Sequence, residues 1–394
     1  MNPVYVVAAV RTPIGKFRGG LAGVRADHLG AHALNELIAR AGVDASQIDD
    51  VIFGNVTQIG EQSANIARTS LLGAGWPETI PAMTIDRKCG SSEAAIHIGA
   101  AQIAAGLGDL VVAGGAEAMS RVPMGSNRAL HGEAFGWMVS DRYELTSQGE
   151  AAERIADKYG FDRDALDDFA AESHRRAAVA TDAGYFLAES IAVPVADLCE
   201  KDWDGSRYTL EADQTIRRDT SREKLSTLKT SFRENGRVTA GNASQISDGA
   251  AVVLLASEAA VKKYGLTPLA LVRSVAVVGA DPALMLEGPI SASRKAAALA
   301  GLSFDDIALF EVNEAFASVP LMWMQATGVG ADRLNVNGGA IALGHPLGAT
   351  GARLATSLIH ELRRTGQKYG LQAICCAGGL ATATVYENLE LKPA

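Results

Sequence analysis

Runs of hydrophobic residues divide the first part of the chain into short strands and helices. Nearly continuous apolar runs, typical of strands buried on both faces, occur at 3–9 (PVYVVAA), 50–54 (DVIFG) and 109–119 (DLVVAGGAEAM). Helical periodicity covers 28–42 and ends at a glycine, and an alanine-rich helix is predicted from about residue 90. This alternation predicts an α/β protein with a largely parallel sheet that is covered on both faces.

The pattern changes between about residues 120 and 240, where charged residues become frequent. Two helices are predicted there, at about 148–160 and 163–184, and a charged irregular stretch follows at 200–237. Apolar strands resume at 247–257 (SDGAAVVLLAS). We therefore interpret the middle of the chain as an inserted domain.

The two ends of the chain resemble each other. TIDRKCGSSEAAIHIGAAQIAAG is followed by DLVVAGGAEAM, and VNGGAIALGHPLGATGARLATSLIHEL is followed by LQAICCAGGLATATVYE. Each pair reads as a glycine-marked turn, a helix rich in small residues and an apolar strand that ends in Gly-Gly. A duplicated α/β unit of this kind places two equivalent turns face to face, where catalytic side chains can meet.

Composition narrows the class of protein. The 394 residues predict two or three domain-sized units, and 48% apolar with 21% charged residues excludes a disordered chain. A formal charge of −9 argues against non-specific nucleic-acid binding. No stretch reaches the ~18 apolar residues of a membrane span, and neither a signal peptide nor a peroxisomal address is recognised. We expect a cytoplasmic protein without nucleic-acid or membrane partners.

The four cysteines are too few for a disulfide scaffold. They are Cys89, Cys199, Cys375 and Cys376. No C-x-x-C motif is present and the histidines are scattered, so no metal site is expected. We expect all four to be reduced thiols.

Cys89 and His345 are the first candidates for chemistry. Cys89 stands between a strand and a helix, where the helix N-terminus together with Arg87 and Lys88 is expected to lower the pKa of the thiol. Five glycines surround His345 in GGAIALGHPLGATG, and a histidine close to a cysteine activates it. The alternatives are a small buried residue at a helix start and an ordinary polar histidine.

Two further groups of polar residues follow apolar strands. Cys375 and Cys376 end a buried strand, for which the alternative is a pair of core thiols. Asn313 and Glu314 follow the strand in FEVNEAFASV, and helix capping by Asn313 is the alternative there. None of these candidates decides the chemistry alone.

Together these segments resemble a known family. TAGNASQISDGAA (239–251), EVNEAFA (311–317), NGGAIALGHPLGATGARL (337–354) and the Cys-Gly-Ser-Ser turn closely resemble the signature segments of thiolases. The resemblance runs from VRTPIGKFRGG (10–20) to the last strand, and its NEAFA and GGAIALGHPLGATG segments are highly specific. It implies an acyltransferase that cleaves a 3-oxoacyl-CoA with CoA, or runs the reverse Claisen condensation, through an acyl-cysteine.

The resemblance also implies a fold. Thiolases have two similar α/β halves that form a five-layered α-β-α-β-α core, with an inserted loop domain. The N-terminal half with the nucleophile is then 1–118 plus 247–268, the loop domain that binds CoA and substrate is 119–246, and the C-terminal half with the acid/base residues is 269–394. A homodimer or homotetramer is implied.

The catalytic roles follow from the same resemblance. Cys89 becomes the acylated nucleophile, His345 takes its proton, and Cys375 moves a proton to and from the α-carbon of the acetyl unit. Asn313 and His345 hold a water that stabilises the enolate oxygen. The backbone N–H groups of Cys89 and Ala377 hold the tetrahedral oxyanion, and removal of one such donor typically costs ~10²–10³ in rate.

The chain departs from the family in two places near this site. The usual Cys-x-Gly-Gly-Gly reads Cys-Cys-Ala-Gly-Gly at 375–379, and assigning Cys375 preserves its spacing to the terminal VYE strand. Ala377 can donate its N–H only if its φ is not one reserved for glycine. Asp86 stands where many members have asparagine.

CoA is the expected co-substrate, with no permanently bound cofactor. By resemblance, Arg217 lies near the nucleotide, Ser244 contacts the pantetheine arm, and Ala315 and Phe316 line its tunnel.

Ser147 and Gln148 replace the usual His-Met before the loop-domain glycine that shapes the acyl pocket. This replacement favours a degradative thiolase over a strict acetoacetyl-CoA synthase, while chain length and direction stay open. The rival interpretations are another condensing enzyme of the superfamily, a non-catalytic acyl-CoA carrier, and a Cys–His hydrolase.

Overall fold

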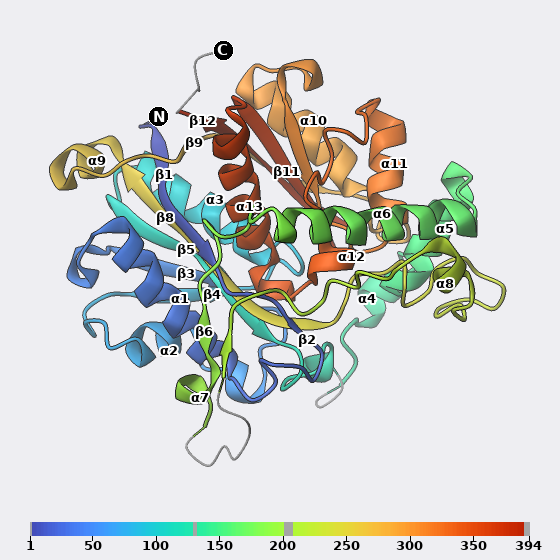
Figure 1. Ribbon diagram of the computed structural model, residues 1–394, viewed down its shortest axis with the longest axis horizontal. Coiled ribbons are helices and arrows are strands. Elements are labelled where there is room, and N and C mark those ends of the chain that lie inside the picture. The colour runs from blue at the N-terminus through green and yellow to red at the C-terminus, as the bar shows by residue number, and fades with distance from the viewer. Residues whose placement is uncertain (1, 129–131, 201–207, 390–394) are drawn as a thin grey trace.

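Five layers of helices and strands make up the body of the protein, as a computed structural model that describes residues 2–128, 132–200 and 208–389 shows (Figure 1). The strands are β1 (Val4–Arg11), β2 (Gly15–Lys16), β3 (Asp50–Gly54), β4 (Ala82–Ile85), β5 (Leu110–Ala118), β6 (Val193–Pro194), β7 (Thr209–Leu210), β8 (Ser247–Ser257), β9 (Ala270–Gly279), β10 (Leu309–Val312), β11 (Tyr369–Cys376) and β12 (Leu380–Asn388).

The helices are α1 (Ala26–Ala41), α2 (Ile66–Gly73), α3 (Ser91–Ala104), α4 (Trp137–Ser140), α5 (Gln148–Tyr159), α6 (Arg163–Asp182), α7 (Val195–Leu198), α8 (Arg222–Ser226), α9 (Glu258–Tyr264), α10 (Gly288–Ala300), α11 (Ser318–Thr327), α12 (Ala340–Leu343) and α13 (Thr350–Thr365). Helices α1 and α2 cover the sheet formed by β1, β8, β5, β3 and β4, while α10 and α11 cover the sheet formed by β9 to β12. Helices α3 and α13 pack against each other between the two sheets.

The strand order is β10-β11-β12-β9-β1-β8-β5-β3-β4, with β2 added beside β8. The two halves of this sheet touch only where Tyr5 and Val6 of β1 pair with β9. Among the described strands, β3-β4, β3-β5 and β10-β11 are parallel, while the other pairings of the large sheet are antiparallel. The prediction of a largely parallel sheet is therefore wrong. The three residues that join β11 to β12 are too few for a parallel crossover, which needs a dozen or more, and β8 enters from the long insertion.

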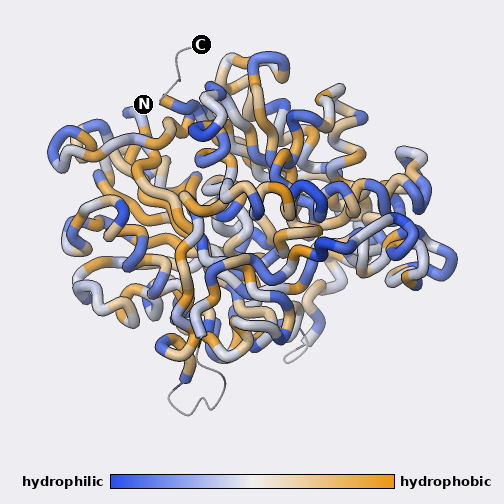
Figure 2. The backbone as a smooth tube through the Cα atoms, in the orientation of Figure 1, coloured by the Kyte–Doolittle hydropathy of each residue, from blue (hydrophilic) through white to orange (hydrophobic). Residues whose placement is uncertain are grey.

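The strands are where the apolar runs predicted them. Every residue of β5 and β8 is buried, and the hydrophobic colouring of Figure 2 follows these strands through the interior, while the outer helices show hydrophobic and hydrophilic residues in alternation. Strands covered by helices on both faces need such continuous hydrophobicity. The predicted helices at 28–42, 148–160 and 163–184 are confirmed as α1, α5 and α6, with ends shifted by at most two residues.

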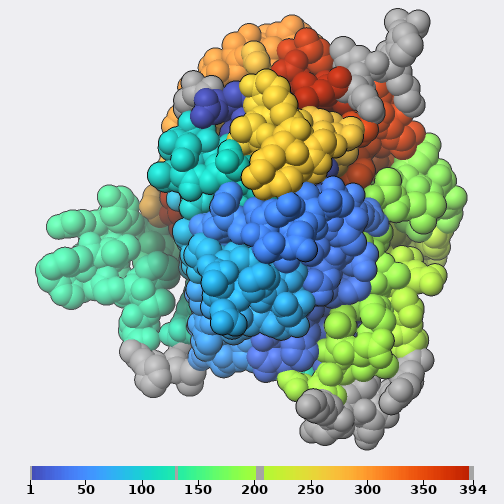
Figure 3. Space-filling model, turned by 90° about the vertical axis from the view of Figure 1, so that its left-hand side faces the viewer, coloured from blue at the N-terminus to red at the C-terminus, as the bar shows by residue number. Residues whose placement is uncertain are grey.

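The segment 119–246 adds helices and only the small β6-β7 ribbon to the described fold. Within the insertion, helix α6 lies against α8. Helices α6 and α5 also lie against α12 and α11, so the insertion packs on helices of the C-terminal part of the chain. The stretch around α4, coloured teal green, projects from the body in Figure 3. Strand β8 and helix α9 then return the chain to the first sheet.

A buried carboxylate ties the central helix α3 to the second sheet. Glu93 is fully buried and accepts hydrogen bonds from the hydroxyls of Thr382 and Thr384 on β12, at 2.5 and 2.6 Å. Such charge-assisted hydrogen bonds offset the cost of burying a carboxylate.

The crossing of α3 and α13 depends on a glycine. A Cβ on Gly351 would lie 2.2 Å from the backbone nitrogen of Glu93, so the two helix backbones leave no room for a side chain there. We expect Gly351→Ala to lower the free energy of unfolding by about 2 kcal/mol or more, as overpacking of a rigid core does. Urea denaturation measures the change.

Gly73→Ala is the matched control, because a Cβ on this helical glycine would only touch Ala31 at 3.7 Å. This variant should be neutral or gain up to about 1 kcal/mol from the lower entropy of its unfolded chain. Equal stability of the two variants would contradict the close crossing of the central helices.

Candidate active site

Cys89 sits in a tight turn between β4 and α3. Lys88 has a positive φ of 52°, which reverses the chain just before the cysteine. The hydroxyl of Ser91 accepts a hydrogen bond from the N–H of Arg87 at 2.8 Å and donates to the carbonyl of Lys88 at 2.6 Å. The turn therefore holds Cys89 at the start of α3 with little freedom to move.

Burial dominates the electrostatics of the Cys89 thiol. It raises the pKa of Cys89 to about 11, against the N–H groups of Cys89 and Ala377, which lower it. The prediction of a lowered pKa is wrong. Lys88 is paired with Asp86 at 2.5 Å, and the carboxylates of Asp86 and Glu117 raise the pKa of the thiol further. Cys89 is thus an uncharged thiol at neutral pH and needs a base.

His345 is suited to be that base. The Thr350 hydroxyl lies 2.9 Å from the carbonyl of Pro346 and 2.6 Å from Nδ1 of His345, so when it donates to the carbonyl it accepts from Nδ1–H. This network assigns the proton of the neutral ring to Nδ1 and leaves Nε2 as the acceptor, and Nε2 is buried without a partner in the described chain. Burial, with a smaller contribution from Arg353, lowers the pKa of His345 to about 3.

Glu117 holds the loops around the site together. This fully buried carboxylate at the end of β5 accepts hydrogen bonds from the N–H groups of Val56 and Thr57, both at 3.0 Å, and of Gly348 at 2.8 Å. Gln62 adds its side-chain amide at 3.1 Å. Sequence reasoning missed Glu117, although an acidic residue in the apolar run LVVAGGAEA was a usable signal.

The last hairpin brings the second thiol to the same place. Cys375 lines the cavity that contains Cys89, whereas Cys376 does not line it and points toward Gly90, where a Cβ would lie 2.7 Å from its sulfur. Burial raises the pKa of Cys375, and nearby Cys89 raises it further. Ala377 is not among the described residues with positive φ, so its N–H can face the sulfur of Cys89 without glycine geometry.

Asn313 follows β10, and its N–H donates to the carbonyl of Ala373 at 3.0 Å. Both polar atoms of its side-chain amide are buried and have no partner in the described part of the chain. The capping alternative is wrong, because α11 begins only at Ser318. Asn313 does not itself line the cavity.

Glu314 is a second buried carboxylate that the sequence reasoning left without a role. It accepts hydrogen bonds from the hydroxyl of Ser173 at 2.7 Å, from the amide of Asn335 at 2.9 Å and from the N–H of Ile341 at 3.1 Å. It therefore joins α6 of the insertion to α12, the helix just before His345.

A cavity of about 770 Å³ connects these groups to the surface. It is lined by every predicted site residue except Asn313: Cys89, Ser147, Gln148, Arg217, Ser244, Ala315, Phe316, His345, Cys375 and Ala377. Most of the remaining lining is apolar, including Phe232, whose ring meets that of Phe316 edge to face at 5.8 Å. The site is an apolar tunnel with a few polar groups at one end, a typical form for a small-molecule site.

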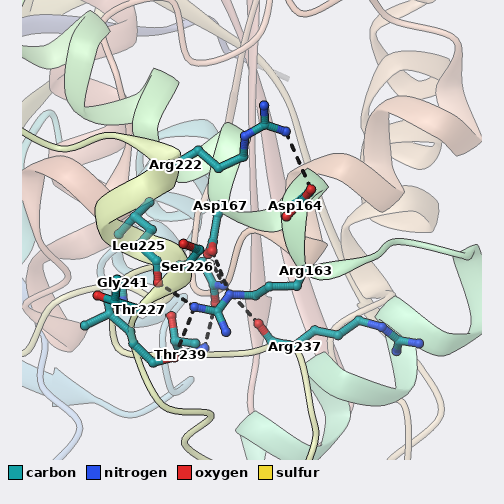
Figure 4. Close-up of polar contacts among 12 residues, drawn as sticks. Arg163, Asp164, Asp167, Arg222, Leu225, Ser226, Thr227, Arg237, Thr239 and Gly241 are labelled. Atoms are coloured by element: carbon teal, nitrogen blue, oxygen red, sulfur yellow. Dashed lines mark hydrogen bonds and ion pairs between the residues drawn. The ribbon is translucent and has the colours of Figure 1, made fainter.

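Hydrogen bonds within the insertion hold the part of the cavity wall that carries Ser244. Fully buried Asp167 of α6 accepts from Arg163 at 2.6 Å and from the side chain of Asn242 at 2.8 Å. Arg163 also donates to the carbonyl of Leu225, as the close-up in Figure 4 shows. Asn242 in turn accepts from the N–H of Thr239 at 2.9 Å, so α6, α8 and the tunnel wall form one hydrogen-bonded unit.

Arg217 stands out among the cations of the insertion. It is exposed and lines the cavity, while Arg218 pairs with Asp182 and Lys224 pairs with Asp219. Within the described ranges, its side chain makes a single hydrogen-bond contact, a long one of 3.5 Å with Gln245. The described residues contain no cluster of His, Cys, Asp and Glu fit to hold a metal ion, and none of their helices is long and apolar enough to cross a membrane.

Comparisons with known proteins agree with this architecture. Residues 4–259 match the model of the thiolase N-terminal domain, and residues 266–388 match that of the thiolase C-terminal domain. The chain belongs to the thiolase family. As a thiolase it is an acyltransferase that acts by thiolytic cleavage or the reverse Claisen condensation, which confirms the predicted family and reaction.

Similar thiolases span the whole chain. A steroid 3-ketoacyl-CoA thiolase of Mycobacterium tuberculosis is 44% identical over 99% of this chain and 95% of its own length, and a 3-ketoacyl-CoA thiolase of Bacillus subtilis is 42% identical over 98% and 100%. The crystal structure of human mitochondrial 3-ketoacyl-CoA thiolase in complex with CoA has a TM-score of 0.89 at 37% identity, covering 99% of this chain and 98% of that one. The five-layered fold is thereby confirmed.

The protonation states of this thiolase predict an unusual pH profile for alkylation of Cys89 by iodoacetamide. Because its pKa is lowered to about 3, His345 is neutral at every pH above that value. Because its pKa is raised to about 11, Cys89 is an uncharged thiol at every pH well below 11. We expect the rate to stay within about twofold from pH 5 to 8. An imidazole with the ordinary pKa of ~6.5 would give about a 25-fold fall from pH 7 to 5.

The control is His345→Ala, in which alkylation depends on the small thiolate fraction and should rise about tenfold per pH unit from pH 7 to 9. Mass spectrometry of the Cys89 peptide separates this thiol from the other three. A wild-type profile with a midpoint near pH 6.5 would contradict the buried neutral pair.

Proposed function

We propose that Cys89, His345 and Cys375 divide the thiolase reaction among themselves. The observation that carries this proposal is that all three line one cavity, in which Cys89 is uncharged and His345 has a free acceptor at Nε2. In the first step His345 takes the Cys89 proton and the thiolate attacks C3 of the 3-oxoacyl-CoA. The C2–C3 bond breaks, the acyl group stays on Cys89, and Cys375 gives its proton to C2 of the departing acetyl-CoA enolate.

The second step restores the enzyme. The thiolate of Cys375 takes the proton of an incoming CoA thiol, and the CoA sulfur attacks the thioester on Cys89. The shortened acyl-CoA leaves, and the Cys89 sulfur regains its proton from His345. Protons and electrons balance over the cycle with no further reactant, and the reverse order gives condensation.

Two sets of donors would stabilise the negative charge on oxygen. The N–H groups of Cys89 and Ala377 converge on the Cys89 sulfur, which supports their role as the oxyanion hole for the tetrahedral intermediate. The buried, unpartnered amide of Asn313 and Nε2 of His345 support a second site, with a bridging water, for the enolate oxygen.

We assign the long part of the cavity to CoA. Arg217 at the rim would meet the anionic nucleotide end, and Ser244, Ala315 and Phe316 would border the pantetheine arm. Ser147 caps α5 by accepting from the N–H of Glu150 at 3.1 Å, and with Gln148 it borders the acyl end of the cavity. No group other than CoA is needed by the chemistry.

We propose the division into 1–118 with 247–268, 119–246, and 269–394, because β8 and α9 return to the first sheet after the insertion. We also propose a homodimer or homotetramer in the cytoplasm that works in the degradative direction, as in fatty acid β-oxidation. The four free cysteines fit a reducing compartment.

Serine replacements of the thiols test the assigned roles. Cys89→Ser should abolish acyl-enzyme formation from acetyl-CoA. Cys375→Ser should still acylate Cys89 but lose about 10²-fold or more in thiolysis, because it removes the proton donor at C2. Steady-state thiolysis and mass spectrometry of the quenched enzyme measure the two effects.

Cys376→Ser is the matched control for the adjacent thiol and should keep thiolysis within about threefold, since Cys376 does not line the cavity. Loss of thiolysis in Cys376→Ser with normal rates in Cys375→Ser would overturn the assignment.

A further inference from the structure

A second, smaller cavity adjoins the first at Cys89. Its volume is about 170 Å³, and it shares Cys89, Met124, Gln148, Leu347 and Ala377 with the large cavity. The residues assigned to CoA do not border it. We call this cavity the distal lobe; its other lining residues are Val56, Thr57, Lys88, Gly125, Asn127 and Arg128.

The lining of the distal lobe is rich in hydrogen-bond donors and cations. Lys88 and Arg128 border it, and no aspartate or glutamate does, although the chain as a whole carries a charge of −9. The hydroxyl of Thr57, a residue that is 1% exposed, has no hydrogen-bond partner in the described chain. A buried hydroxyl of this kind costs free energy unless a ligand or water pairs with it.

The two cations differ in their partners. Lys88 is paired with Asp86 at 2.5 Å, and Asp86 also accepts from the backbone N–H of Lys88 at 2.7 Å. Arg128 has no ion pair and no side-chain hydrogen bond among the described residues. Among the residues that the structure describes, the lobe therefore has one neutralised cation, Lys88, and one guanidinium without a counter-ion, Arg128.

The segment that carries Arg128 is anchored beside the lobe. Arg121 pairs with Glu61 at 2.5 Å before the segment begins, and the side chain of Asn127 donates to the carbonyl of Val56 at 3.3 Å. A short 3-10 turn at Ser126–Arg128 follows Gly125, whose φ of 84° suits glycine. These contacts hold Arg128 at the lobe.

We propose that the distal lobe binds a carboxylate at the far end of the acyl chain, so that the preferred substrates are short 3-oxoacyl-CoAs derived from dicarboxylic acids. The inference rests on the proposed function, in which Cys89 attacks C3 and the atoms beyond C3 stay on the acyl side. The guanidinium of Arg128 matches a carboxylate in two parallel hydrogen bonds.

The volume of the lobe sets the length of this chain. At ~30 Å³ for each group of the size of a water molecule, the lobe holds about five or six non-hydrogen atoms. A six-carbon 3-oxo chain that ends in a carboxylate places five such atoms beyond C3, namely three carbons and two oxygens. Longer unbranched chains have no room there without displacement of the segment at 124–128.

A matched pair of substrates tests the proposal. We would compare kcat/KM for thiolysis of 3-oxoadipyl-CoA, which ends in a carboxylate, and of 3-oxohexanoyl-CoA, which has the same six carbons and ends in a methyl group. The wild-type enzyme should prefer 3-oxoadipyl-CoA by about tenfold or more, the size expected for a charge-assisted hydrogen bond. The preference should shrink as salt is added, because Arg128 is exposed.

Replacement of Arg128 identifies the group responsible. Arg128→Gln should lower kcat/KM for 3-oxoadipyl-CoA about tenfold, mainly through KM, and leave 3-oxohexanoyl-CoA within about twofold. Arg128→Lys should keep part of the preference. Arg142→Gln removes an exposed charge from the same insertion, outside both cavities, and should leave the preference unchanged.

Acetoacetyl-CoA has only a methyl group to place in the lobe. Its thiolysis therefore separates a failure of the proposed function from a failure of the carboxylate site. Turnover of acetoacetyl-CoA without a wild-type preference for 3-oxoadipyl-CoA, or an equal effect of Arg128→Gln on both six-carbon substrates, would overturn this inference alone. Failure to cleave any of the three substrates and to acylate Cys89 would overturn the proposed function and the inference with it.

Discussion

Burial keeps Cys89 and His345, the side chains that we propose to react in this thiolase, uncharged at neutral pH, and the proposed chemistry depends on that constraint. The pKa of Cys89 is raised and that of His345 is lowered, so both groups begin the reaction neutral. Charge then appears only when the thiol proton moves and the carbonyl oxygen develops negative charge. The N–H groups of Cys89 and Ala377 are already in place for it, which is the sense in which the site is preorganised.

Buried carboxylates position the glycine-rich turns that carry these groups. Glu117 binds the turns around Thr57 and Gly348, Glu314 binds the helix before His345, and Glu93 joins α3 to the last strand. Each carboxylate is surrounded by N–H or O–H donors, which offset the cost of its burial. The loops can therefore be rich in glycine without being loose, since their backbone N–H groups are held by side chains from rigid strands and helices.

Local periodicity in the sequence predicted the long helices α1, α5 and α6 and the buried strands β1, β3, β5 and β8. The resemblance of its motifs to thiolases named ten of the residues that line the cavity. The sequence did not predict strand direction, since β8 and β12 acquire theirs from the insertion and from a three-residue turn. The prediction of a lowered pKa for Cys89 was also wrong. The sequence shows the helix position and Lys88, but it does not show the burial of the thiol or the Lys88–Asp86 pair. Glu117 was visible only as an acidic residue in an apolar run, and its hydrogen-bond partners are distant in the chain. Arg128 likewise gains its proposed role from neighbours that are distant in the chain, and no local pattern points to it.

The most direct test of the central claim is to locate the acyl group in the quenched enzyme. The Cys89 thiol shares its cavity with the neutral His345 and receives the two converging N–H groups, while Cys375 and Cys376 lie close by with raised pKa values. Peptide mass spectrometry after incubation of the wild-type enzyme with acetyl-CoA and an acid quench should find the acetyl group on Cys89 alone. An acetyl group on Cys375 or Cys376, or turnover without any acylated cysteine, would contradict the account.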